Sequence, residues 1–549
     1  MKRYLLLIVA VFVLSSSYYL LKRYYKLTQP NNLSEYAPAD CLAYIELNRI
    51  SDLIGAITET SAWQELAPQF GIPRELQSID ELASFLAVTG LGEDKLPGLL
   101  TAEFAAVIDG LSIEGSPANS EVEIVPALTV LIKTNAKPEA VSELVKSKSQ
   151  LLAKRIYGKQ LSQNSFSIAN REVYRYAPVN ASNKQLLAAA YGNLILISNN
   201  DSSIERCITA IAQGNTLAKN QQFAKLRKKA SIFAYITPNG IGKFLSLATS
   251  VPNGQRINES AVLGLTYELN FDTLGAEERF ELLLHPELTS KLSSFQQATL
   301  TDSRMLRVGN KYEVWLLNSA QPIAYLHKLV EVASISLPAA AAFTLNNFVI
   351  ELEQRFGIDD STSQLLGNEI GIVRLAPDRT VKFAKVKDKL FVLNVSRAYL
   401  QSDDTKAVIR SEQIAGNEVV IGNQSRAATF LDEYLLVGHK EDLAQVIEAY
   451  KEPSKLQTAK GSITVVEPCD KALADFFLRL SHLLRTTDGS KDHLLKVKSN
   501  LRQRATGGSL TENGLVIESR SPLGPIPLLA ELILPLDEEV ETWQSRQKS

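Results

Sequence analysis

The sequence has little cysteine and histidine for its length, which limits the chemistry it can carry. Its 549 residues include 3 cysteines and 5 histidines. The cysteines are far apart and odd in number, which excludes a disulfide framework and a close-spaced thiolate metal site. The sequence contains no two histidines three or four residues apart, so a local pair of metal ligands is also missing. We therefore expect no metal and no cofactor.

Long runs of like charge are also missing. The 58 basic and 60 acidic residues give a net charge of −2 and are mixed along the chain, so the sequence lacks the charge pattern of a nucleic-acid-binding protein. It contains no phosphate-binding loop and no Gly-x-Ser-x-Gly turn of a hydrolase. Gly90 and Gly92 are followed by acidic residues rather than by the third glycine of a dinucleotide loop, and they indicate a turn. A catalytic site built from residues far apart in the sequence is the one enzymatic possibility that these motifs leave open.

What the chain does contain is an internal repetition. Segments of the first half recur in the same order in the second half. The matched segments are 43–48 with 314–318, 99–107 with 365–373, and 194–208 with 434–447. Alternating apolar residues and amphipathic stretches in both halves predict a mixture of strands and helices. The predicted fold class is α+β: two tandem repeats of one mixed, largely antiparallel sheet-and-helix domain, preceded by a single N-terminal membrane helix.

Two helices can be placed from their ends. Pro138 is typical of a first helical position, and acidic residues early with lysines late predict a helix from there to about Lys154. Asn200 or Asp201 is expected to cap a second helix, whose apolar face carries Ile204, Cys207, Ile208 and Ile211.

The repetition also sets the predicted domain boundaries. They are a membrane anchor or signal segment at 1–26, a linker at 27–36, a first α+β repeat at 37–290, a second at 300–520, and an apolar, proline-rich strip with a polar tail at 521–549. Four prolines and Glu531 argue against a second membrane span within the strip. It either docks on the second repeat or contacts a partner or a membrane.

An apolar stretch near the N-terminus suggests the membrane anchor. Lys2 and Arg3 precede it, and Lys22 and Arg23 follow it. A helix of about 18 residues rises about 27 Å, close to the ~30 Å hydrocarbon core of a bilayer. Cleavage after Ser17 would instead make this stretch a secretory signal. The predicted anchor residues are Tyr4, Leu5, Leu6, Leu7, Ile8, Val9, Val11, Phe12, Val13, Leu14, Tyr18, Tyr19, Leu20 and Leu21.

Two glutamates occupy matching places in the repeated segments. Glu103 and Glu369 each stand just before an apolar strand. They could be paired ligands or acid–base groups at two equivalent sites. Alternatively, each carboxylate accepts hydrogen bonds at a strand end or pairs with a neighbouring basic side chain. Replacing both by glutamine would separate the two interpretations.

Some motifs resemble bacterial membrane-anchored envelope proteins that are grouped only as a domain of unknown function. The similarity lies in a Pro-Ala-Asp-x-x-x-Tyr segment at 38–44, in Phe348-x-x-Glu351-Leu-Glu353 with Phe356 to Asp359, and in the Leu-Leu-Gly-Asn-Glu turn at 365–369. It covers most of 36–520, and at the turn the first half has Thr101-Ala102 in place of Gly-Asn. The resemblance implies an anchored envelope protein and no activity.

Together these features predict a non-catalytic, membrane-anchored extracytoplasmic scaffold or binding protein of unknown ligand. The expected location is the bacterial inner membrane, with a single pass and the bulk of the chain extracytoplasmic, or alternatively secretion after signal cleavage. Expected partners are the membrane and a protein, peptide or apolar ligand, but no nucleic acid. An envelope hydrolase with dispersed residues between the repeats, or a lipid-handling protein, remains the alternative.

Overall fold

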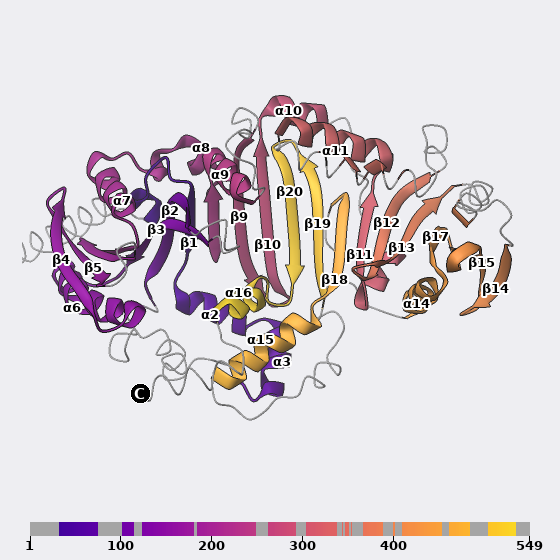
Figure 1. The fold of residues 1–549 in the computed structure, drawn as a ribbon, viewed down its shortest axis with the longest axis horizontal. Helices are drawn as coiled ribbons and strands as arrows, with labels where there is room; N and C mark the ends of the chain where they lie inside the picture. Colours follow the sequence, from indigo (N-terminus) through magenta and orange to yellow (C-terminus); the bar gives the residue numbers. More distant parts are fainter. Residues whose placement is uncertain are drawn as a thin grey trace, which may run out of the picture. The chain divides into compact units, whose positions relative to one another are not determined.

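A computed structural model describes the fold (Figure 1). The described residues are 32–74, 101–114, 123–179, 184–248, 262–292, 303–336, 343, 346–347, 349–350, 353, 366–387, 399–400, 409–452, 461–483 and 503–533. Contacts divide the chain into two compact units. The first comprises Met1–Glu46 with Ala102–Arg227, and the second comprises Leu47–Thr101 with Lys228–Ser549.

In the first unit, antiparallel hairpins build a sheet whose strand order is β1-β2-β3-β7-β6-β5-β4. The turn between β4 and β5 places Ala169 and Asn170 at positive φ, which is the backbone of a tight hairpin. The strands are β1 (Ala43–Leu47), β2 (Glu103–Glu114), β3 (Glu123–Lys133), β4 (Leu161–Ile168), β5 (Arg171–Pro178), β6 (Leu186–Tyr191) and β7 (Leu194–Ser198).

The helices of this unit pack on its sheet. The helix predicted from Pro138 is confirmed as α6 (Pro138–Tyr157), which lies against β5 and β6. The second predicted helix is confirmed as α7 (Asp201–Gln213), which lies against β3 and β7. The shorter elements are η1 (Leu33–Tyr36), η5 (Leu217–Lys219) and α8 (Gln221–Leu226).

The second unit holds one antiparallel sheet of order β8-β9-β10-β20-β19-β18-β11-β12-β13-β17-β16-β15-β14. Its strands are β8 (Ile232–Ile236), β9 (Val262–Asp272), β10 (Gly275–Leu284), β11 (Glu313–Asn318), β12 (Leu366–Ala376), β13 (Arg379–Val386), β14 (Arg410–Ile414), β15 (Asn417–Ile421), β16 (Arg426–Leu431), β17 (Tyr434–His439), β18 (Ile463–Pro468), β19 (Gln503–Thr511) and β20 (Gly514–Ser521).

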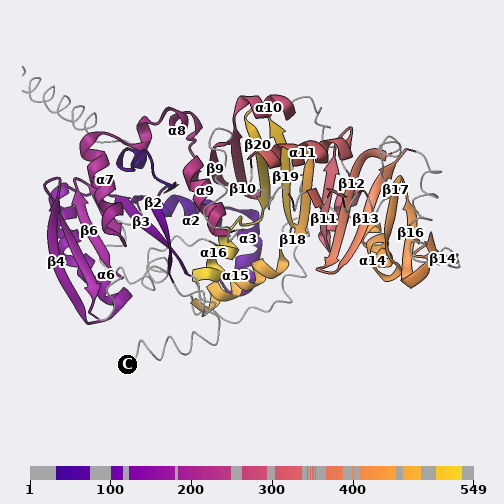
Figure 2. The same cartoon turned by 45° about the horizontal axis from the view of Figure 1, so that its top comes forward.

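Helices cover the two ends of these strands, with α10 and α11 at one end and α3, α15 and α16 at the other (Figures 1 and 2). At the second end, Trp63 and Phe70 pack against Phe477 in a buried aromatic cluster. The helical elements of this unit are α2 (Ile50–Thr58), α3 (Ser61–Leu66), η2 (Ala67–Phe70), α9 (Pro238–Ala248), α10 (Pro286–Leu292), η6 (Arg304–Asn310), α11 (Pro322–Ser336), η8 (Asn423–Ser425), α14 (Lys440–Lys451), α15 (Asp470–Leu483) and α16 (Ile526–Ile533).

The predicted fold class is wrong. The described structure is mostly antiparallel sheet with 20 strands and some helices, and a layout of two tandem α+β domains is not shown. The last strand before the expected boundary, β10, pairs with β20 from Ala276↔Ser521 to Leu283↔Gly514. Strand pairing does recur, because β2–β3, β3–β7 and β6–β7 correspond in order to β12–β13, β13–β17 and β16–β17. The similar segments did not predict which strands pair.

The predicted membrane anchor from Tyr4 to Leu21 lies outside the described residues, which begin at 32. In the described part of the chain, no helix combines the length and apolar character needed to cross a bilayer. This finding contradicts the predicted single-pass inner-membrane location.

The apolar strip is docked along part of its length. Leu523 and Ala530 are buried in the cluster around Trp63, and α16 packs on α15. Leu528 and Leu529 on the other side of α16 are 51 % and 43 % exposed. The part of the strip beyond residue 533 is outside the described residues.

Candidate functional site

Helix α7 carries the candidate site of the first unit. The side chain of Asn200 accepts a hydrogen bond from the backbone N–H of Ser203 at 3.2 Å, so Asn200 is the cap that fixes where the helix begins. Ile204, Cys207 and Ile208 are fully buried against the sheet. The amphipathic pattern therefore turns the opposite face of α7, with its polar side chains, away from the core.

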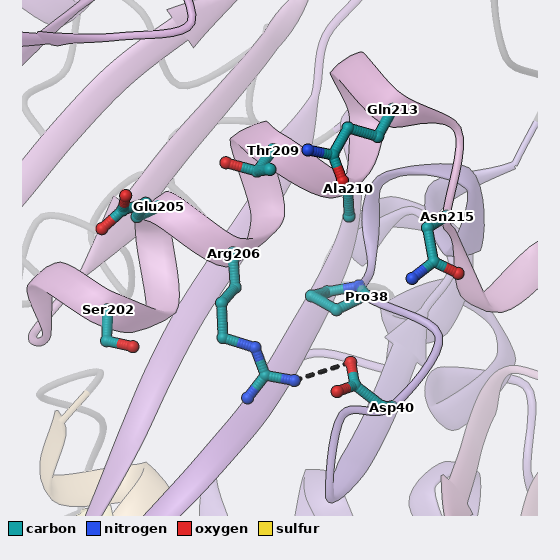
Figure 3. A pocket seen from close by; sticks show the side chains of 9 residues that line it. All are labelled: Pro38, Asp40, Ser202, Glu205, Arg206, Thr209, Ala210, Gln213 and Asn215. Carbon is teal, nitrogen blue, oxygen red and sulfur yellow. Dashed lines mark hydrogen bonds and ion pairs between the residues drawn. The ribbon is translucent and has the colours of Figure 1, made fainter.

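A polar hollow lies beside this face, between α7 and the turn that precedes β1 (Figure 3). Its volume is about 380 Å³. The backbone N–H of Ala39 donates to the carbonyl of Asn215 at 3.4 Å, which holds the turn against the end of α7. The lining residues are Pro38, Asp40, Ser202, Glu205, Arg206, Thr209, Ala210, Gln213 and Asn215.

Arg206 reaches two carboxylates. Its Nη2 donates to Oδ1 of Asp40 at 2.7 Å, and its Nη1 lies 3.6 Å from Oδ1 of Asp109. Side-chain exposure is 78 % for Asp40, 34 % for Arg206 and 4 % for Asp109. The guanidinium therefore connects a buried carboxylate to one in solvent. Burial lowers the pKa of Arg206, but Asp109 and Asp40 outweigh that effect, so the pKa is raised.

A bulge in β2 brings Asp109 to this position. The β2–β3 register shifts between Ile108 and Gly110, and Asp109 is the extra residue, as is common where a strand turns a side chain toward a site. Its Oδ2 accepts a hydrogen bond from the Ser203 hydroxyl at 2.7 Å, which in turn lies 2.8 Å from Thr129 Oγ1. Burial raises the pKa of Asp109, while the Ser203 hydrogen bond and the Arg206 charge lower it, with a net upward shift.

The hollow offers more negative than positive charge. Arg206 is balanced by Asp40 and Asp109, and the exposed carboxylate of Glu205 has no hydrogen bond or ion pair with any described residue. Such a lining can accept hydrogen bonds from a cationic group. Ser202 and Thr209 supply hydroxyls, but none of the nine lining residues is a histidine, lysine or cysteine that could activate them.

Cys41 and Cys207 are buried free thiols, and burial raises the pKa of both. Raised thiol pKa values mean little thiolate at neutral pH, which makes these cysteines unreactive. In the described part of the chain, no group of three or more histidine, cysteine, aspartate or glutamate side chains could hold a metal ion.

The two glutamates singled out by the sequence lie in different units and in different surroundings. Glu103, 36 % exposed, accepts from Lys133 Nζ at 3.3 Å, its register partner on β3. Glu369 is 1 % exposed and accepts from the hydroxyls of Ser303 and Tyr434, each at 2.6 Å. Burial, then the Glu369 hydrogen bond, raises the pKa of Tyr434. Neither glutamate lines the hollow beside α7.

Sequence reasoning missed Asp40, Asp109 and Arg206. The available signals were a charged residue placed next to the buried stripe of α7, and an aspartate within the apolar strand that begins at Phe104. Neither signal shows that these residues meet. The bulge in β2 brings Asp109 to Arg206, and the turn packed against the end of α7 brings Asp40.

Comparison of the chain with family models, with curated proteins and with solved structures finds no match. The functional conclusion therefore depends on the geometry alone.

Proposed function

We propose that this chain is a non-catalytic binding protein whose hollow beside α7 takes a cationic group, such as the guanidinium or ammonium of a small polar molecule or a peptide. The observation that carries the proposal is the charge balance at Arg206. The arginine is already engaged by Asp40 and Asp109, while Glu205 has no partner among the described residues. An incoming cation would find carboxylate acceptors at the rim and a fixed network behind them.

The exposure of each group supports this assignment. Asp40 keeps 78 % of its side chain accessible although it pairs with Arg206, so its second oxygen can accept from a ligand. Asp109 beneath is 4 % exposed and holds Arg206 from behind, which fixes the guanidinium without filling the hollow. An anion would meet Arg206 together with the carboxylates that already neutralise it. An apolar ligand would leave these polar groups without water or partners.

A titration with Nα-acetylarginine amide tests the proposal, using calorimetry on the full chain. Wild type should bind this probe, and the double variant Asp40→Asn/Glu205→Gln should bind at least about tenfold more weakly, because hydrogen bonds to charged groups contribute about 1.5–3 kcal/mol. The matched control Glu441→Gln/Glu448→Gln removes two exposed acidic charges from α14 instead.

The control should bind like wild type. Equal loss in both double variants would mean that the probe responds only to net charge, and unchanged binding in the α7 variant would place it elsewhere. Either result contradicts the proposal. Circular dichroism confirms that each variant is folded.

A further inference from the structure

The edge strands β4 of the first sheet and β14 of the second are protected to different degrees. A strand at the edge of a sheet exposes unpaired backbone N–H and C=O groups, and proteins usually guard such strands with charges, proline, bulges or short length. Strand β14 follows this rule, because it spans only Arg410–Ile414 and carries Arg410 and Glu412 as an ion pair at 3.4 Å. Glu412 also pairs with Lys440.

Strand β4 has none of these protections. It is longer, Leu161–Ile168, and its sequence Leu-Ser-Gln-Asn-Ser-Phe-Ser-Ile contains no charge and no proline. Within the described chain it pairs with β5 alone, in an unbroken register from Leu161↔Pro178 to Ile168↔Arg171 (Figure 1). Its side chains from Ser162 to Ser165 are all exposed. Among the described residues, the second edge of β4 is thus long, regular and unpaired.

We propose that two copies of this chain associate through β4, strand against strand, in an antiparallel pair. A two-fold axis normal to the sheet keeps each side chain on its own face and pairs a central residue with its own copy. We place that axis at Asn164, because an amide both donates and accepts and can therefore bond to an identical amide.

The absence of charge along β4 suits pairing with a second copy. With Asn164 at the centre, Gln163 faces Ser165 of the second copy, and Ser162 faces Phe166. The nearest charged residue, Lys159, then faces Ala169, so the register brings no like charges together. Phe166 is held on its own strand pair by Arg175, whose guanidinium carbon lies 4.7 Å from the ring centre. The outward edge therefore offers backbone groups and neutral side chains to an identical strand.

Sedimentation velocity of the full chain over a concentration series tests this proposal. Wild type should form a dimer, and Asn164→Lys or Asn164→Glu alone should weaken the dimer at least about tenfold, because each puts like charges face to face. Mixing the two variants in equal amounts should restore the dimer. Gln413→Lys, an exposed position on β14, is the matched control and should dimerise like wild type.

Other outcomes would overturn the proposal. A wild-type chain that stays monomeric up to its solubility limit has no such pair. A dimer that resists both Asn164 variants, or that Gln413→Lys weakens equally, uses another surface. Variants that dissociate but do not recombine on mixing would show that the partner of β4 is not a second β4. Circular dichroism spectra like that of wild type show that the exposed substitutions leave the fold intact.

Discussion

Helices α7 and α14 are built alike but differ in their polar surroundings. Each follows an antiparallel strand pair, β6–β7 or β16–β17, and packs fully buried aliphatic side chains against its sheet. Beside α14, the ring of Tyr312 lies next to the helix and its hydroxyl donates to Gln445 at 3.2 Å. Beside α7, the neighbouring segment presents Pro38 and Asp40, and Arg206 lines a hollow (Figure 3).

Buried aliphatic side chains hold both helices in place, but only α7 lines the hollow described above. Apolar packing is similar in both helices, so it explains position and not function. The site depends on the residue that the neighbouring segment brings to the helix: a tyrosine packs beside α14 and bonds to Gln445, whereas a short aspartate leaves room beside α7.

The largest expected effect is the loss of stability when a buried isoleucine of either helix is truncated, and it tests whether apolar packing holds both helices alike. Ile208 and Ile447 are both 0 % exposed. Ile208→Ala and Ile447→Ala should each lower the free energy of unfolding by about 2–4 kcal/mol, through lost apolar burial and the cavity left behind. Urea denaturation of both variants measures this. A large cost at one position only would show that the helices are not held alike.

The next effect tests the difference between the helices. Arg206→Ala leaves the buried carboxylate of Asp109 without its cation and should cost about 1–2 kcal/mol, a value reduced because Arg206 is partly exposed. Gln445→Ala removes one hydrogen bond to Tyr312 and should cost less than about 1 kcal/mol. Equal costs in urea denaturation would contradict the assigned role of Arg206.

A third effect concerns the glutamates that the sequence paired. Glu369→Gln introduces a buried amide donor and should cost about 1–2 kcal/mol, whereas Glu103→Gln removes a partly exposed ion pair and should cost less than about 0.5 kcal/mol. Thermal unfolding measures both costs. Neither variant should change binding of Nα-acetylarginine amide. Loss of binding in either one would reinstate these glutamates as site residues.

The smallest effect is a pH dependence at Asp109. Because its pKa is raised in the folded chain above the ordinary 3.8, the native state holds this proton more tightly than the unfolded state does. Stability therefore falls as the pH rises from the unfolded pKa through the folded one. Asp109→Asn should lack this decline, so its stability relative to wild type should rise across that window. Urea denaturation at several pH values measures it, and a constant difference would refute the assignment.

Local patterns predicted the elements better than their assembly. Pro138 and a cap at Asn200 or Asp201 predicted where α6 and α7 begin, because helix ends depend on neighbouring residues. The pairing of β10 with β20 could not be predicted, since the sequence of a strand carries no local signal for a partner more than 200 residues away. The site could not be predicted either, because Asp40, Asp109 and Arg206 are far apart in sequence and meet only through tertiary packing.

The central claim is that the hollow beside α7 recognises positive charge. The most direct test compares Nα-acetylarginine amide with Nα-acetylcitrulline amide, which has nearly the same shape but a neutral end. We expect calorimetric titration to detect binding of the arginine compound, weakening as salt is added, and little binding of the citrulline compound. Equal affinity for the two compounds, or no binding of either, would contradict the claim.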